Sequence, residues 1–145
     1  MKVQRPAVIV LAVLIVAAAL VVGTHAVTGR TSDLDRLRQA RGASLLPPGS
    51  TVLSRREVDT RTNVVARNPA FTSVTAQTGQ SGNAVRDYYR TELLARGYTV
   101  QLSLGHPVGQ LEDTYRRAGI SATVDVPVGL TASPVTFTYG LTITR

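Results

Sequence analysis

Hydrophobic and polar residues alternate along three segments in the C-terminal half of the chain, over 98–104, 120–128 and 135–145. A period of two is typical of a strand with one buried face, so each segment predicts a β-strand. The expected inward positions are Tyr98, Val100, Leu102 and Leu104; Ile120, Ala122, Val124, Val126 and Val128; and Val135, Phe137, Tyr139, Leu141 and Ile143.

Other segments predict two further strands and two helices. The segments 51–58 and 70–78 are rich in β-branched residues and predict strands. Apolar residues at helical spacing over 83–97, followed by a glycine stop, predict the main helix. A short helix is expected over 32–42, with Ser32 as its N-cap, on the surface or continuing toward the membrane. The segment 110–119 is compatible with a short helix or with a strand.

These elements predict an α+β fold. We expect an N-terminal transmembrane helix followed by a small antiparallel sheet of four or five strands, covered by one main helix. The final strand should be integral to this sheet. Pro127 lacks a backbone N–H, so its strand is expected to end there or to lie at an edge open to pairing with another chain.

The N-terminal segment is the strongest hydrophobic feature. Residues 7–23 carry no charge and would span roughly 25 Å as a helix, at the lower limit for crossing a bilayer. Lys2 and Arg5 precede the segment and favour a cytoplasmic N-terminus. We therefore expect an anchor at the plasma membrane; the alternative is a signal peptide cleaved near Ala26, which would release a secreted protein.

The predicted domain organisation follows from this anchor. It comprises a cytoplasmic N-terminus over 1–6, a transmembrane helix over 7–23, a linker with the short helix over 24–44, and an extracytoplasmic α+β domain over 45–145.

Composition narrows the expected partners. The chain has 16 basic and 9 acidic residues, a formal net charge of +7, and all but one of its basic residues are arginine. Such a domain could contact anionic lipid or wall polymer, whereas no nucleic-acid-binding motif is present. The chain has no cysteine, which excludes disulfides and cysteine-ligated metals.

No residue pattern predicts catalysis, and no cofactor or metal is expected. His106 lies in a Gly-His-Pro turn and no G-x-S-x-G motif accompanies it, so a hydrolase is the weakest hypothesis. The pairs Glu57/Asp59 and Glu112/Asp113 are read as surface charges. The candidate site is instead a set of anion contacts, Arg55, Arg56, Arg116 and Arg117, because guanidinium groups suit carboxylate and phosphate.

Two segments of the sequence resemble a known group of small bacterial domains. "LLPPGSTVLSRREV" and "AVRDYYRTELLARGYTV", followed by an alternating C-terminal pair, resemble small membrane-anchored or secreted α+β domains of unknown function from actinobacteria. The resemblance spans about 45–145. It implies a fold and an extracytoplasmic location, and transfers no catalytic residue.

The sequence therefore predicts a non-enzymatic, single-pass membrane-anchored protein whose outer domain binds a protein or envelope partner. The alternative is a secreted or anchored binder of a small ligand or anionic wall polymer. The oligomeric state is not predicted.

Overall fold

The structure, a computed structural model, describes residues 31–62, 67–106, 109–127 and 133–144. The chain divides after Thr31, and Ser32–Arg145 forms one compact unit. The predicted transmembrane helix over 7–23 lies outside the described residues.

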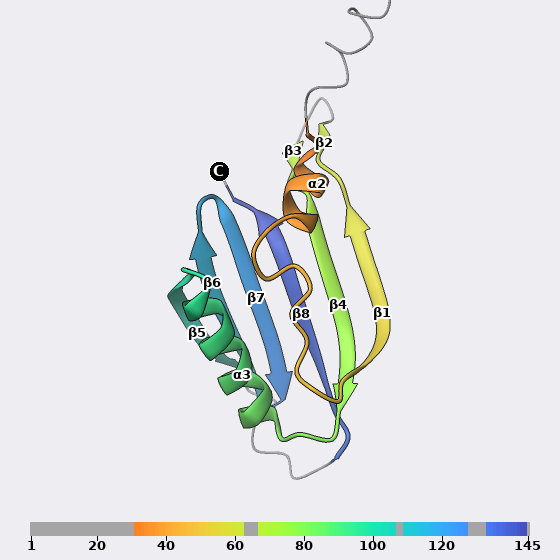
Figure 1. The fold of residues 1–145 in the computed structure, drawn as a ribbon, viewed down its shortest axis with the longest axis vertical. Coiled ribbons are helices and arrows are strands. Elements are labelled where there is room, and N and C mark those ends of the chain that lie inside the picture. The colour runs from red at the N-terminus through yellow and green to blue at the C-terminus, as the bar shows by residue number, and fades with distance from the viewer. Residues whose placement is uncertain (1–30, 63–66, 107–108, 128–132, 145) are drawn as a thin grey trace, which may run out of the picture. The chain divides into compact units, whose positions relative to one another are not determined.

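A six-stranded antiparallel sheet with the strand order β1-β4-β8-β7-β6-β5 dominates this unit (Figure 1). Its strands are β1 (Thr51–Val58), β4 (Phe71–Thr78), β5 (Thr99–His106), β6 (Gln110–Arg117), β7 (Ile120–Pro127) and β8 (Val135–Ile143). A separate two-stranded pair, β2 (Arg61–Thr62) and β3 (Arg67–Asn68), extends the β1–β4 hairpin.

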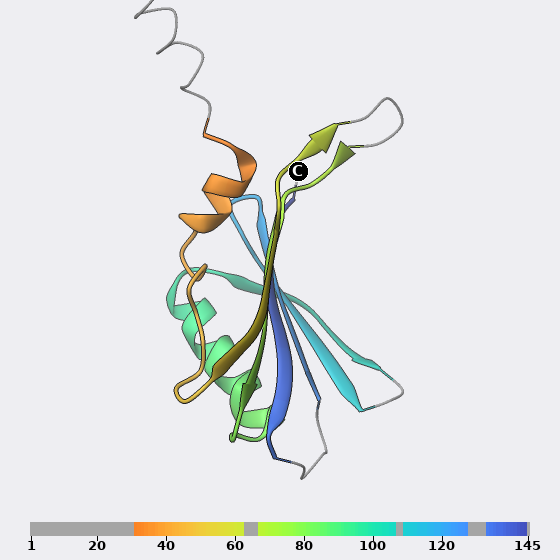
Figure 2. The ribbon, with the colours of Figure 1, turned by 90° about the vertical axis from the view of Figure 1, so that its right-hand side faces the viewer.

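One face of the sheet is covered and the other is not. The helix α3 (Gly82–Ala95) crosses the β5–β7 side, and α2 (Asp33–Arg38) lies on the same face with the segment 39–50 that leads to β1 (Figure 1). Figure 2 shows all of these elements on one side of the sheet. We call this side the covered face and the opposite side the uncovered face.

Both helices begin at a serine cap. The Ser32 hydroxyl accepts a hydrogen bond from Asp35 N, and the Ser81 hydroxyl accepts one from Ala84 N, which satisfies amides that have no partner inside a helix. Leu37 of α2 and Val85, Tyr89 and Leu93 of α3 are fully buried, and the α3 residues repeat every four positions. Apolar spacing therefore fixes which side of α3 meets the sheet.

Two tyrosine side chains hold the segment 39–50 against the sheet through hydrogen bonds to its backbone. Tyr89 stacks on Tyr139 with ring centroids 4.6 Å apart. The Tyr139 hydroxyl donates to Gly42 O at 2.9 Å, and the Tyr89 hydroxyl donates to Leu45 O at 3.2 Å. A segment without regular structure thus gains buried partners for its backbone.

The predicted fold class was wrong. Among the described residues the protein is mostly a six-stranded antiparallel sheet with two short helices, rather than four or five strands under one main helix. The segment 110–119 contributes the extra strand, β6. Its charged residues resemble a helix in sequence, but Asp113 and Tyr115 alternate into the buried side of the sheet.

Of three further expectations, the first was wrong, the second held in one of its two alternatives and the third was confirmed. The helix α2 does not merely lie on the surface, since its Leu37 enters the core. Pro127 ends its strand, but β7 lies between β8 and β6 and is not an edge; the edges are β1 and β5. The final strand does have the integral place that was expected, between β4 and β7.

The inward pattern expected for 98–104 was also wrong. Tyr98 is buried, but Val100, Leu102 and Leu104 are 44%, 49% and 44% exposed. The strand β5 is paired on one side only, and its register with β6 shifts between Val100 and Leu102. This irregularity turns Leu102 and Leu104 to the uncovered face, opposite Thr114 and Glu112.

Candidate functional site

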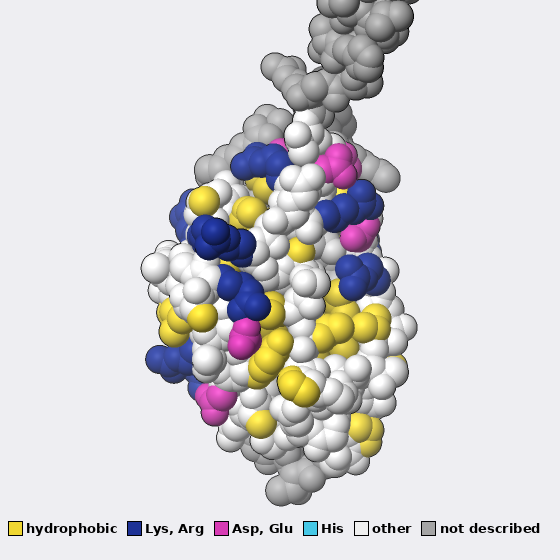
Figure 3. All heavy atoms as spheres, viewed as in Figure 1, with side chains coloured by type: hydrophobic (Ala, Val, Ile, Leu, Met, Phe, Trp, Pro, Cys, Tyr) yellow, Lys and Arg dark blue, Asp and Glu magenta, His cyan; other side chains and the backbone are white. Residues whose placement is uncertain are grey.

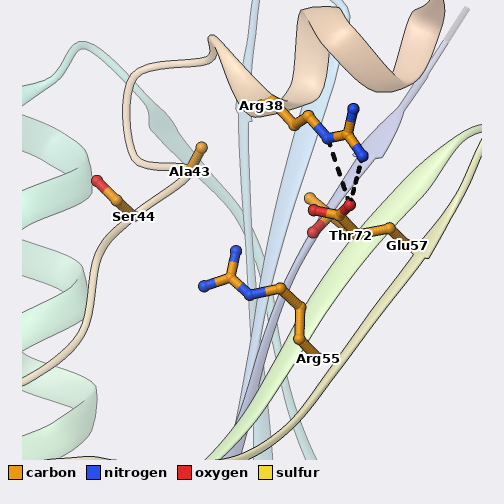
Figure 4. Close-up of a pocket in the computed structure, with 6 residues that line it drawn as sticks. All are labelled: Arg38, Ala43, Ser44, Arg55, Glu57 and Thr72. Atoms are coloured by element: carbon orange, nitrogen blue, oxygen red, sulfur yellow. Dashed lines mark hydrogen bonds and ion pairs between the residues drawn. The ribbon is translucent and has the colours of Figure 1, made fainter.

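A pocket of about 280 Å³ opens on the covered face, between β1 and the segment that follows α2 (Figure 4). Both charged residues that β1 contributes are paired with buried positions of β4, Arg55 with Val74 and Glu57 with Thr72. The residues that line the pocket are Arg38, Ala43, Ser44, Arg55, Glu57 and Thr72.

Arg38 and Glu57 form an ion pair at one end of this pocket. Arg38 Nη2 and Nε lie 2.7 Å and 3.3 Å from Glu57 Oε2. The hydrogen bond from Arg38 lowers the pKa of the Glu57 carboxyl; burial opposes this, while the charges of Arg38 and Arg55 add to it. The same hydrogen bond raises the pKa of Arg38. Both groups therefore remain ionised and neutralise each other.

Arg55 is placed differently. Its guanidinium extends into the space between β1 and the chain at Ala43 and Ser44, and the close-up draws no contact to it (Figure 4). Within the described part of the chain, Arg55 makes neither a hydrogen bond nor an ion pair. It acts on Glu57 only through its charge. The pocket thus carries two positive charges and one negative charge, and one arginine fork has its donors free.

This arrangement suits binding of an anion. A guanidinium presents several N–H donors in a plane and matches carboxylate or phosphate oxygens. At the opposite wall the Ser44 hydroxyl points away from Arg55, so Arg55 supplies the free donors of this pocket (Figure 4). Figure 3 views the same face of the molecule and shows further basic side chains spread over it. The described residues contain no cluster of His, Cys, Asp or Glu that could hold a metal ion.

Arg56, the neighbour of Arg55, points to the opposite side of the sheet. It pairs with Ser73 on the uncovered face, and its Cζ lies 5.3 Å from the centre of the Phe71 ring. Arg56 and Phe71 line a second, open pocket of about 460 Å³ together with Val58, Asn68 and Pro69. The Arg56 guanidinium therefore already makes a favourable contact with the Phe71 ring and is less available to an anion.

The four candidate arginines do not converge. Arg116 lies on the uncovered face, in register with Ser121, whereas Arg117 lies on the covered face, close to Gly97. The strand β6 is four places from β1 in the sheet, roughly 19 Å at the usual strand spacing. One small anion can therefore contact Arg55 or Arg116, but not both. The sequence indicated Arg55 and missed its neighbour Arg38, whose place depends on how α2 packs.

A second charged cluster is closed rather than open. Asp113 is 2% exposed; its carboxylate accepts from Arg86 Nε at 2.6 Å, Ser103 Oγ at 2.5 Å and Tyr115 Oη at 3.4 Å. Burial alone would raise the pKa of Asp113, but the hydrogen bonds from Arg86, Ser103 and Tyr115 and the charge of Arg86 together lower it. With its acceptors occupied, this cluster links α3 to β5 and β6.

The remaining sequence candidates give no site. Glu112 and Asp113 point to opposite faces of β6, so they cannot share a cation. His25 lies outside the described residues, as does the side chain of His106. In the described ranges, no helix is long and apolar enough to cross a membrane.

Comparisons with known proteins give no relative for this chain. No family model, curated protein or solved structure matches it.

Proposed function

We propose that the protein is a non-enzymatic binding domain, held on the outer side of the plasma membrane by its apolar segment 7–23. In this proposal it binds an envelope partner through an anionic group of that partner, which enters the pocket at Arg55. The partner is a protein or another envelope component that displays a carboxylate or phosphate.

The observation that carries this proposal is the contrast between Arg38 and Arg55. Both line one pocket, but Arg38 is neutralised by Glu57 and Arg55 is not. Arg55 is itself exposed, so an anion can reach its guanidinium from solvent. The formal net charge of +7 also favours approach of an anionic partner.

The charge variants of β1 should change anion affinity in opposite directions. For acetate and for inorganic phosphate, measured by titration of the full chain in nonionic detergent, Arg55→Gln should weaken binding by roughly tenfold, the loss of charge-assisted hydrogen bonds. Glu57→Gln should strengthen it by roughly threefold or more, because a repelling charge is removed.

Arg56→Gln is the matched control, since it removes the same charge from the next residue but on the opposite face. Equal weakening by Arg55→Gln and Arg56→Gln would mean that only net charge matters, and the pocket would then have no specific role. Binding should also fall as salt concentration rises.

The location of the protein is tested by its intact mass in membrane and culture fluid. An anchored protein gives a species of 15.4 kDa in the membrane fraction. A shortened species in the fluid, beginning near Val27, would show cleavage and would contradict the anchor while leaving the Arg55 pocket unaffected.

A second candidate function is binding of an extended anionic wall polymer on the uncovered face. Arg56 and Arg116 share that face, and their separation of roughly 19 Å suits a polymer better than a small ion. If this function holds, the double variant R56Q/R116Q loses polymer binding and Arg55→Gln does not.

A further inference from the structure

The two edges of the main sheet differ in how well they are protected against pairing with another strand. Edge strands in natural proteins usually carry charges, proline or bulges, because their free N–H and C=O groups can bind a further strand. The strand β1 has three consecutive charged residues, Arg55, Arg56 and Glu57, and α2 reaches it through the Arg38–Glu57 ion pair. The β1 edge is therefore protected.

The other edge, β5, lacks most of these devices. Its eight residues, TVQLSLGH, include no acidic residue, lysine, arginine or proline. Its one protecting feature is the register shift between Val100 and Leu102. Beyond that shift, Leu102 and Leu104 stand exposed on the same face, beside Thr114 and Glu112 of β6.

We propose that β5 pairs antiparallel with β5 of a second copy of this chain, across a two-fold axis at Ser103. In this register Leu102 of each copy lies opposite Leu104 of the other, so four exposed leucine side chains bury one another on the uncovered face. The two six-stranded sheets become one continuous sheet.

A second copy fits this edge because β5 is compatible with itself. A two-fold axis at Ser103 places Ser103 opposite its own counterpart and every other residue opposite the one at equal distance beyond the axis, so Leu102 faces Leu104 and Gln101 faces Gly105. None of these opposed pairs brings two charges together, whereas an axis at Arg56 of β1 would place that arginine opposite itself.

This pairing is independent of the proposed function. The strand β5 is the opposite edge of the sheet from β1, which lines the Arg55 pocket, so the pocket stays open in the dimer. Each dimer would present two such pockets. Failure of the anion titration therefore leaves this inference intact, and the reverse also holds.

The absence of cysteine from the chain allows a clean cross-linking test. In the full chain in nonionic detergent, Ser103→Cys should form a disulfide-linked species of twice 15.4 kDa under mild oxidation, since directly opposed residues of an antiparallel pair are close enough to bridge. Leu53→Cys, an exposed position on the β1 edge, is the matched control and should remain monomeric.

The Ser103→Cys substitution removes a hydroxyl that donates a hydrogen bond to Asp113. A second variant therefore tests whether cross-linking depends on the proposed pairing or only on this local change. Adding Leu104→Lys to Ser103→Cys should reduce cross-linking by at least about tenfold, because the charge would be buried against Leu102 of the second copy. Adding Leu53→Lys should not. The wild-type full chain should sediment as a dimer.

The proposal would be overturned by cross-linking of Ser103→Cys no faster than of Leu53→Cys, by cross-linking that Leu104→Lys does not reduce, or by a full chain that sediments as a monomer at every concentration. Capture of a different protein's strand at β5 in place of a second copy would overturn it as well.

Discussion

Replacement of Asp113 by alanine is expected to lower the free energy of unfolding by about 3–5 kcal/mol, the usual cost of removing one partner from a buried ion pair. The carboxylate is almost completely buried and accepts hydrogen bonds from Arg86, Ser103 and Tyr115. Without it, the Arg86 guanidinium, whose side chain is 29% exposed, loses its ion-pair partner. Urea unfolding at neutral pH, followed by circular dichroism, measures the loss.

Asp113→Asn is the matched control, because it keeps the shape of the side chain while it removes the charge and turns one acceptor oxygen into a donor. The pKa of Asp113 in the folded protein lies below its ordinary value of 3.8. Its contribution is therefore complete above that value and is lost as the pH falls from 3.8 through the lower folded pKa. The stability gap between wild type and Asp113→Asn should narrow over this acidic range; a gap that stays constant would show that the carboxylate is not held ionised by its partners.

Replacement of Tyr139 by alanine is expected to cost about 3–5 kcal/mol, as for other large aromatic residues removed from a core. Tyr139 lies on the central strand β8, stacks on Tyr89 and is 2% exposed. The substitution leaves a cavity between α3 and the sheet and frees the segment 39–50 at Gly42. Thermal and urea unfolding should both detect this loss of stability.

Tyr139→Phe separates packing from hydrogen bonding. It keeps the ring and removes only the hydroxyl that donates to Gly42 O at 2.9 Å. Because that carbonyl also accepts from Leu45 N at 3.1 Å, the expected cost is only about 1 kcal/mol. If Tyr139→Phe were as harmful as Tyr139→Ala, the stacking of Tyr139 on Tyr89 would contribute little and our description of the core would be wrong.

The strands with one buried face could be predicted well from the sequence. Apart from Ile120, which is only partly buried, and Val128, which lies outside the described residues, the alternation in β7 and β8 identifies their buried residues correctly, because both strands are interior and have one side under α3 or the segment 39–50. The predicted bounds of β1 are the observed ones, Thr51–Val58. A period of two is informative wherever one face is buried and the other is wet.

The same signal failed at β5 and β6 for two different physical reasons. In β5, one irregular pairing reversed the faces of Leu102 and Leu104, and a sequence alone does not reveal where a register shifts. In β6, Asp113 was read as a surface charge but is buried, and its partner Arg86 lies on the helix α3. That long-range pair is invisible to local periodicity.

Only part of the candidate site could be predicted from the sequence. Arginine bias pointed to Arg55 and Arg56, but alternation along β1 places them on opposite faces, and only packing of the segment 39–50 makes a pocket around Arg55. Arg38 and Glu57 are 19 residues apart in the chain. Their pairing leaves Arg55 as the open cation, and no spacing rule predicts it.

The most direct test of the Arg55 pocket is a map of where an anion binds on the unaltered protein. Backbone amide resonances of the isotopically labelled full chain, recorded during titration with acetate, give that map residue by residue. Our account predicts saturable shifts at Ser44, Arg55 and Thr72, and no comparable change at Arg56 or Arg116. Small, unsaturated shifts spread over arginines of both faces would contradict it, since they would show a general attraction of charge and no site.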